Sequence, residues 1–196
     1  MADSPLKLAF QNGTLAVTGP SRLPDCLKGY CVPDPRLPGW RAEAANYAAI
    51  YTLLFREKIP CLDEARNYST VALTLHDTRS PRYYQQEALD AWMRQRRRGI
   101  TVLPTGTGKS FLAMMAMAKC QRSTLIVAPT IDLMEQWATQ LQRAFDCPVG
   151  MLGGGSREVC DITVSTYDSA VLMMEFIGNR FGLLIVDECH HLPGPV

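Results

Sequence analysis

Residues 103–110 of the chain read Leu103-Pro104-Thr105-Gly106-Thr107-Gly108-Lys109-Ser110. The apolar run Ile100–Leu103 leads into it, and Lys109–Lys119, which has a helical pattern, follows it. A glycine-rich turn between a strand and a helix is the setting in which phosphate-binding loops occur. The stretch therefore predicts a strand, a phosphate loop and a helix in succession.

The chemistry of this loop follows from its residue types. Gly106 and Gly108 let the backbone curl until its N–H groups point into a phosphate-sized hollow. The positive end of the following helix strengthens that anion site, Lys109 can reach the outer phosphates of a nucleotide, and Ser110 can hold Mg²⁺. The usual first glycine of the pattern falls on Leu103, but the strand–turn–helix context favours a phosphate loop over a chance turn. The residues predicted to cradle the nucleotide are Pro104, Thr105, Gly106, Thr107, Gly108, Lys109 and Ser110.

A pair of acids follows a second apolar run, Leu183–Val186. Acids at the end of a buried strand are costly unless a cation or a reaction needs them. Asp187 is placed to hold Mg²⁺, and Glu188 to orient and deprotonate an attacking water. By itself such a pair is equally consistent with a solvated surface, and the upstream phosphate loop is what favours a catalytic reading.

Helices and strands alternate from Pro81 onward, which predicts an α/β fold. The strands are continuous apolar runs, as expected for a parallel sheet covered by helices on both faces. Ligands of such sheets bind at the carboxyl ends of the strands, where the loop and the acids lie. The expected helices are Tyr84–Arg97, Lys109–Lys119, Leu133–Phe145 and Ser169–Ile177, and the expected strands are Ile100–Leu103, Thr124–Ala128, Ile162–Ser165 and Leu183–Val186.

Residues 1–80 have a different pattern and are predicted to form a small α+β domain, followed by a second domain over 81–196. Asn12-Gly13 between the apolar runs Leu6–Phe10 and Leu15–Val17 predicts a hairpin. The proline-rich segment that follows is expected to lack regular structure, and Val71–Leu75 is expected to form a strand. A helix is expected over Arg41–Lys58, and its apolar face would carry Ala44, Tyr47, Ala48, Tyr51, Leu54 and Phe55.

The overall composition narrows the class of protein only a little. The net charge is +1, so any surface for nucleic acid would have to be local. The arginines between Arg94 and Arg98 stand where a helix would end, and a solvated helix terminus explains them as well as DNA binding does. Seven scattered cysteines form no zinc set, and no stretch has the length of a signal core or a membrane span. These features favour an intracellular protein that does not act at a membrane.

Asp187-Glu188-Cys189-His190 after such a loop resembles the DExH branch of superfamily 2 helicases, and the wider pattern resembles the XPB type. The segments Val164–Ala170 and Asp187–Pro193 point to XPB rather than to helicases at large. The resemblance implies a RecA-like motor lobe that uses ATP and Mg²⁺ and acts on duplex and single-stranded DNA. Residues 1–80 resemble, more loosely, the damage-recognition domain that precedes the motor in prokaryotic members.

The resemblance also assigns roles to single residues. It places Arg82 and Gln85 beside the adenine, and it gives His190 the coupling of the ATP site to the DNA site. From the residues alone, Thr130 and Thr166 are equally consistent with helix caps, and Trp137 is expected to be core. The residues that the resemblance assigns to DNA contact are Pro129, Thr130, Gln136, Gly153, Gly154, Ser165 and Thr166.

Helicases of this type continue with a further motif and a second lobe, which supplies an arginine to the transition state. This chain is therefore expected to bind nucleotide but to hydrolyse it poorly when isolated. Two alternatives remain, the motor of a restriction-type DNA translocase and a non-catalytic DNA-binding module; intact Lys109, Asp187 and Glu188 argue against the second. Expected partners are a repair nuclease or subunits of a transcription and repair complex, in a prokaryotic cytoplasm or, less favoured, a nucleus.

Overall fold

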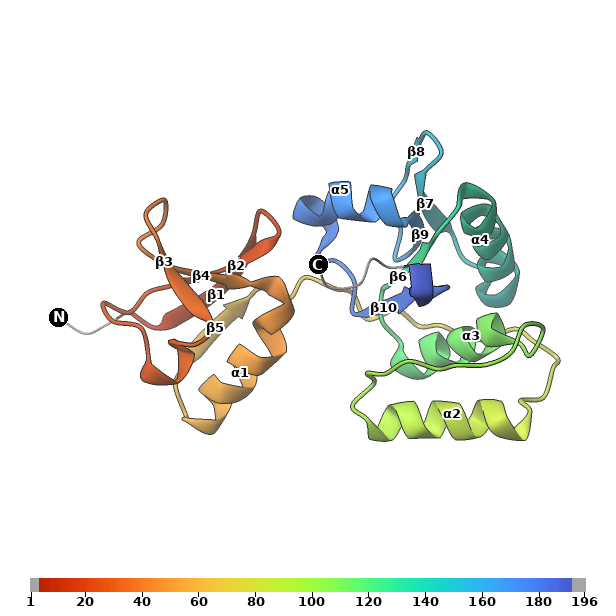
Figure 1. Cartoon of the computed structure of the whole chain (residues 1–196), viewed down its shortest axis with the longest axis horizontal. Helices are drawn as coiled ribbons and strands as arrows, with labels where there is room; N and C mark the ends of the chain where they lie inside the picture. Colours follow the sequence, from red (N-terminus) through yellow and green to blue (C-terminus); the bar gives the residue numbers. More distant parts are fainter. Residues whose placement is uncertain (1–3, 192–196) are drawn as a thin grey trace. The chain divides into compact units, whose positions relative to one another are not determined.

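A computed structural model describes residues 4–191 and divides them into two compact units (Figure 1). Unit 1 holds the chain up to Tyr68 together with Val171–Arg180, and unit 2 holds Ser69–Ala170 and the chain from Phe181. The part of the XPB-like tail formed by Leu192 and Pro193 lies outside the described residues. No helix in residues 4–191 is long and apolar enough to cross a bilayer.

Unit 1 is built on a five-stranded sheet in the order β3-β4-β2-β1-β5. Asn12 and Gly13 turn the chain between β1 and β2 with φ of 49° and 75°, as a two-residue hairpin requires. This confirms the predicted hairpin. The strands are β1 (Leu6–Gln11), β2 (Thr14–Thr18), β3 (Cys31–Asp34), β4 (Gly39–Glu43) and β5 (Cys61–Glu64).

One helix, α1 (Tyr47–Arg56), follows the short 3-10 turn η2 (Ala44–Asn46) and packs on this sheet. Its side chains Ile50 and Leu54 are fully buried. The predicted helix was therefore too long and partly misplaced. Residues 41–43 belong to β4, because a full ladder with β2 outweighs helical spacing, and Phe55 is 79% exposed rather than packed.

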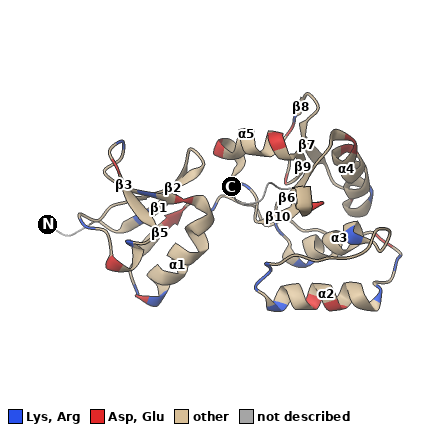
Figure 2. Ribbon diagram, in the orientation of Figure 1, with Lys and Arg blue, Asp and Glu red and all other residues tan. Residues whose placement is uncertain are grey.

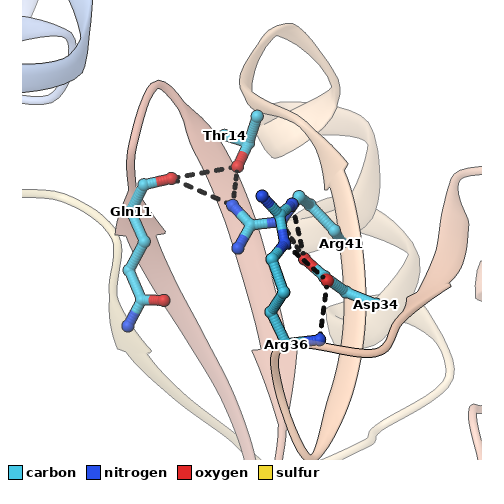
Figure 3. Close-up of polar contacts among 5 residues, drawn as sticks. All are labelled: Gln11, Thr14, Asp34, Arg36 and Arg41. Carbon is cyan, nitrogen blue, oxygen red and sulfur yellow. Dashed lines mark hydrogen bonds and ion pairs between the residues drawn. The ribbon is translucent and has the colours of Figure 1, made fainter.

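The proline-rich segment is more regular than predicted. It contains the 3-10 turn η1 (Asp25–Leu27) and strand β3, in which Pro33 lies opposite Trp40 of β4. Strand β3 is at the edge of the sheet. Proline has no backbone N–H, and in an edge strand this need not cost the sheet a hydrogen bond. The turn from β3 to β4 is fixed by Asp34, whose carboxylate accepts hydrogen bonds from Arg36 and Arg41 (Figure 3).

Unit 2 has a second sheet in the order β10-β6-β9-β7-β8, in which the first four strands are parallel. Helices flank it, which confirms the predicted α/β class (Figure 1). The strands are β6 (Thr124–Ala128), β7 (Val149–Gly153), β8 (Ser156–Arg157), β9 (Ile162–Thr166) and β10 (Leu183–Val186). The helices of unit 2 are α2 (Tyr83–Arg94), α3 (Lys109–Cys120), α4 (Ile131–Phe145) and the 3-10 turn η3 (Cys189–His191). Helix α5 (Tyr167–Ile177) begins in unit 2, and its residues from Val171 onward belong to unit 1.

Helix α3 lies between the sheet and α2, which explains why it is apolar on nearly all sides. Met114 and Met117 join the core formed with α4 and the strands. Phe111 and Met115, on another face of the helix, pack with Leu89 of α2. A helix buried on two sides cannot show a narrow apolar stripe, so its position is fixed by tertiary packing.

The predicted strand Ile100–Leu103 is wrong, because this run joins no sheet. Ile100 and Val102 are 78% and 88% exposed. Strand β10 is at the edge of the sheet and pairs only with β6 among the described strands, and a cavity of about 610 Å³ is lined both by β10 and by Ile100–Leu103. An extended run without a neighbouring strand keeps its backbone groups for water rather than for a ladder.

The predicted strand Val71–Leu75 is also wrong, and its contacts explain where the units divide. The Leu73 N–H donates to Gln121 Oε1 (3.0 Å), and Gln121 Nε2 donates to the Leu73 carbonyl (2.7 Å). One amide side chain thus takes the place of a neighbouring strand. Leu73 is buried in the core of unit 2, so unit 2 begins at Ser69, whereas the sequence prediction placed the boundary at residue 80.

Candidate functional site

The predicted phosphate loop forms an open turn at the start of α3. Gly106 and Gly108 have φ of 76° and 85°, values that residues with a Cβ rarely adopt. A Cβ added at Gly106 would meet nothing within 4 Å, so this face of the loop is open to a ligand. A Cβ at Gly108 would lie 2.6 Å from Gln85 Nε2, so glycine is also needed there for space.

The loop rests on the first turn of α2. Gln85 is 4% exposed, and its Nε2 donates to the carbonyls of Thr107 (3.0 Å) and Gly108 (3.2 Å). Its Oε1 accepts from the Arg82 N–H (3.0 Å), and the Tyr84 hydroxyl also donates to the Thr107 carbonyl (3.0 Å). The structure thus places Arg82 and Gln85 beside the loop, with Tyr84 as a contact that the sequence did not single out. Their contact with an adenine stays a prediction.

The acidic pair lies beside this loop. Lys109 Nζ is 3.1 Å from Glu188 Oε1, which joins two motifs that are far apart in the sequence. Lys109, by its hydrogen bond and charge, lowers the pKa of Glu188 against the opposing effect of desolvation. Glu188 has φ of 48°, an uncommon value for a residue with a side chain and typical of a constrained site. His190 Nδ1 lies 3.4 Å from Glu188 Oε2, while its role in coupling stays a prediction.

Both carboxylate oxygens of Asp187 accept hydrogen bonds. The Glu188 N–H donates to Oδ1 (3.1 Å), and the Trp137 indole N–H donates to Oδ2 (2.7 Å). The Tyr167 hydroxyl donates to the carbonyls of Asp187 and Glu188, and burial raises the pKa of this phenol. Trp137 is in the core, as predicted, but the sequence analysis missed its bond to Asp187. The available signal was that a buried indole N–H requires an acceptor.

The oxygen ligands in this region fit magnesium. Mg²⁺ is commonly held by one or two carboxylates together with substrate phosphates. The Asp187 carboxylate has four lone-pair positions, of which two are used, and Ser110 adds a hydroxyl in the first turn of α3. The helix N-terminus and the positive-φ glycines fit a phosphate chain. The arrangement can therefore hold a nucleotide with its metal and place a carboxylate next to the outer phosphates.

The motifs predicted to contact DNA meet at the carboxyl ends of β6, β7 and β9. A Cβ at Gly154 would lie 3.2 Å from Ile131, the first residue of α4, and a Cβ at Gly153 would lie 3.1 Å from Thr166. Thr130 is exposed, and its Oγ1 caps α4 by accepting the Leu133 N–H (3.3 Å). Pro129 and Gln136 lie on either side of this cap, and Gln136 is exposed.

Ser165 and Thr166 do not have the same surroundings. Ser165 is fully buried, and its hydroxyl donates to the carbonyls of Leu152 and Thr166 (both 2.9 Å). Thr166 is partly exposed and accepts the Ser169 N–H (3.3 Å). The hydroxyl that this motif offers at the surface is therefore that of Thr166, and Ser165 supports it from inside the sheet. Contact of either motif with DNA stays a prediction.

Basic side chains are dispersed over both units, and one run stands out at the end of α2 (Figure 2). Arg94, Arg96, Arg97 and Arg98 are all exposed, and Arg96 and Arg97 have positive φ. Arg94 is in the last turn of α2 and the other three directly follow the helix, where cations interact favourably with the helix dipole. The run fits a solvated helix end and is compatible with a phosphate backbone.

Two protein families match successive parts of the chain. The family described as "Type III restriction enzyme, res subunit" matches residues 78–195. The family described as "Xeroderma pigmentosum group B helicase damage recognition domain" matches residues 8–65. The boundary between the two matches agrees with the division into units after Tyr68.

Individual relatives cover most of this chain but a smaller part of their own length. "DNA 3'-5' translocase XPB2" of Sulfurisphaera tokodaii is 40% identical over 85% of this chain and 39% of the relative. "Putative DNA 3'-5' helicase Rad25" of Haloarcula marismortui is 32% identical over 80% of this chain and 26% of the relative. The transcription and DNA repair factor IIH subunit XPB of Antonospora locustae is 24% identical over 95% of this chain and 33% of the relative. The chain thus spans less than half the length of these relatives.

Proposed function

We propose that the chain is the ATP-binding lobe of a DNA-dependent ATPase that unwinds or translocates on duplex DNA. The chain belongs to the XPB-type DNA helicases, and its residues 78–195 match the family of the restriction res subunit. The observation that carries this proposal is the approach of Lys109 to Glu188 at 3.1 Å. It joins a phosphate loop and an acidic pair at one edge of a parallel sheet, as nucleotide hydrolysis requires.

Each residue of the site has a distinct task in this proposal. Bound Mg·ATP supplies the phosphoryl group that is transferred to water. Lys109 neutralises the outer phosphates, while Ser110 and Asp187 would hold the metal. Glu188 orients the water and accepts its proton, and the hydrogen bonds of Gln85 keep the loop in shape for the phosphates.

In the absence of nucleotide, Lys109 and Glu188 pair with each other. Phosphates compete for the Lys109 ammonium, so nucleotide binding frees the Glu188 carboxylate for the water. The partial exposure of both side chains, 34% and 31%, leaves room for this exchange. The ion pair therefore holds both groups at the site until the nucleotide arrives.

The DNA would lie across the carboxyl ends of β6, β7 and β9. Thr130, Gln136, Thr166 and the Gly153-Gly154 turn are hydroxyl, amide and backbone groups, which bind phosphates without reading sequence. A motor that moves along DNA needs contacts of this kind, on duplex and on single strands alike. Unit 1 would add a preference for distorted duplex, which is easier to bend or unstack than intact duplex.

The location and partners follow from the same proposal. Relatives named as DNA repair and transcription helicases act on DNA, so this chain would work inside the cell, in a prokaryotic cytoplasm. A repair nuclease or the subunits of a transcription and repair complex would be its protein partners. The alternative of a restriction-type translocase keeps one supporting observation, the match of residues 78–195, but it does not account for the match of residues 8–65.

Nucleotide binding tests the proposal directly. Titration calorimetry with Mg·ADP should show saturable binding to the chain, and Lys109→Ala should weaken it at least about tenfold, as the loss of a charged hydrogen bond predicts. Lys119→Ala, which removes an exposed lysine from the same helix, is the matched control and should bind as the wild type does. Equal affinity of wild type and Lys109→Ala would exclude the proposed phosphate loop.

A further inference from the structure

The Asp187 carboxylate is held by a residue that neither the acidic motif nor the phosphate loop contains. Trp137 Nε1 donates to Asp187 Oδ2 at 2.7 Å, a short bond for an N–H donor, as expected for a charged acceptor. The second oxygen, Oδ1, accepts the Glu188 N–H at 3.1 Å. Because one donor acts on each oxygen, the plane of the carboxylate is fixed in both rotation and tilt.

Packing alone does not explain this bond. Trp137 is 5% exposed and shares its core with Met117 and Leu141, so its ring could be satisfied by apolar contacts. Its polar edge, however, meets the one carboxylate that is placed to hold Mg²⁺. An outer partner of this kind orients a metal ligand, and removing it commonly costs 10–100-fold in metal affinity.

A second donor reaches the same turn from another helix. The Tyr167 hydroxyl donates to the carbonyls of Asp187 and Glu188, and Tyr167 is the first residue of α5. Trp137 belongs to α4, which Thr130 caps, and Tyr167 directly follows Thr166. Helices α4 and α5, which begin next to the predicted DNA contacts Thr130 and Thr166, thus each provide one hydrogen-bond donor to the acidic turn.

We propose that Trp137 is a positioning residue for magnesium, which acts by holding the Asp187 carboxylate in the orientation that meets the metal of a bound nucleotide. Tyr167 holds the backbone of the same turn. This inference rests on the proposed function and adds to it the side chain through which α4 acts on the metal site. Asp187 remains the residue that touches the metal.

The test compares the effect of magnesium on ADP affinity in two tryptophan variants. Trp137→Phe keeps an aromatic ring in the core and removes the N–H donor, and Trp92→Phe is the matched control from α2. Calorimetry with ADP in EDTA and with ADP plus Mg²⁺ gives the factor by which magnesium strengthens binding. That factor should fall about tenfold in Trp137→Phe, while the affinity for ADP in EDTA stays the same. In Trp92→Phe the factor should be unchanged.

A spectroscopic readout keeps the inference testable if Trp137→Phe folds poorly. The chain has three tryptophans, so indole ¹⁵N labelling gives three N–H resonances, which single Trp→Phe variants assign. In the wild type, adding Mg²⁺ to the ADP complex should shift the Trp137 resonance more than those of Trp40 and Trp92. A full magnesium effect in folded Trp137→Phe, or an unmoved Trp137 resonance, would overturn the inference alone. Absence of ADP binding by the wild type would overturn the proposed function with it.

Discussion

At the scale of single residues, the account depends on the competition between a phosphate chain and Glu188 for the Lys109 ammonium. The two side chains are 3.1 Å apart, and the pKa of Glu188 is lowered chiefly by its hydrogen bond with Lys109. In the proposed function, Glu188 would accept a proton from the attacking water only after Lys109 has turned from it to the phosphates. The carboxylate thus opposes nucleotide binding and promotes the step that follows it.

Replacing Glu188 by Gln separates these two effects. Glu188→Gln keeps the size of the side chain but removes the charge that competes for Lys109. We expect the affinity for Mg·ADP to stay the same or to rise up to about tenfold, since a charged hydrogen bond no longer has to be broken. Glu87→Gln, which changes an exposed glutamate of α2, is the control. Calorimetry that finds Glu188→Gln weaker than wild type would show that Glu188 helps to bind the nucleotide.

The sequence was sufficient to predict the position of site residues that belong to a motif with a recognisable residue type and spacing. Lys109 and Glu188 meet as predicted, and Asp187 and Glu188 follow strand β10 as predicted, although the phosphate loop that carries Lys109 follows no strand. Trp137 and Tyr167 could not be assigned in this way. Their polar atoms bond to the acidic turn from positions 50 and 20 residues before it in the sequence, and no local pattern encodes such a contact.

At the scale of helices and strands, the sequence pattern predicted a strand correctly where a second strand lies beside it. Strand β10 ends where it was predicted, and so does β6, since continuous apolar runs fit a buried parallel sheet. Ile100–Leu103 has the same composition but no neighbour to pair with, and Val71–Leu75 pairs with the side chain of Gln121 instead of a strand. Strand formation needs a second strand, and a single stretch of sequence does not show whether one is present.

The β3–β4 turn of unit 1 supplies a prediction about pH at this scale. Asp34 is 6% exposed and is bound by Arg36 and by Arg41, which also donates to Thr14 and to the Gln11 carbonyl (Figure 3). The hydrogen bonds from Arg36 and then Arg41 lower the pKa of Asp34 far below the usual range. A carboxyl whose pKa falls on folding contributes stability above its unfolded pKa and loses it as pH falls through the folded pKa.

We therefore expect Asp34→Asn to lower the melting temperature near neutral pH, with a difference from wild type that narrows as the solution is acidified below pH about 4. Thermal unfolding followed by circular dichroism across this pH range measures it. Asp25→Asn is the control, because Asp25 is exposed and its ion pair with Lys28 is screened by water. Equal shifts of the melting temperature for the two variants at every pH would show that the hydrogen bonds of Asp34 add no stability beyond that of an exposed ion pair.

At the scale of the whole molecule, the chain corresponds to part of the length of its relatives. The chain covers 39% of its Sulfurisphaera relative and 26% of its Haloarcula relative, and residues 78–195 match the family of the restriction enzyme res subunit. Two units with separate sheets and cores were predicted from the change of pattern along the chain. The structural units divide after Tyr68, because Leu73 contributes to the core of unit 2, whereas the sequence analysis placed the domain boundary at residue 80.

DNA-dependent ATP hydrolysis is tested by comparing the rate of a polypeptide extended to the length of these relatives with that of the 196-residue chain. Rates are measured without DNA, with intact duplex and with mismatched duplex at one salt concentration, because affinity for DNA depends steeply on salt. The account predicts stimulation by DNA in the extended polypeptide, more by mismatched than by intact duplex. It predicts little hydrolysis by the 196-residue chain, since an arginine supplied from elsewhere is worth ~10³–10⁵ in rate. Brisk DNA-stimulated hydrolysis by the 196-residue chain alone, or an extended polypeptide whose rate DNA leaves unchanged, would contradict it.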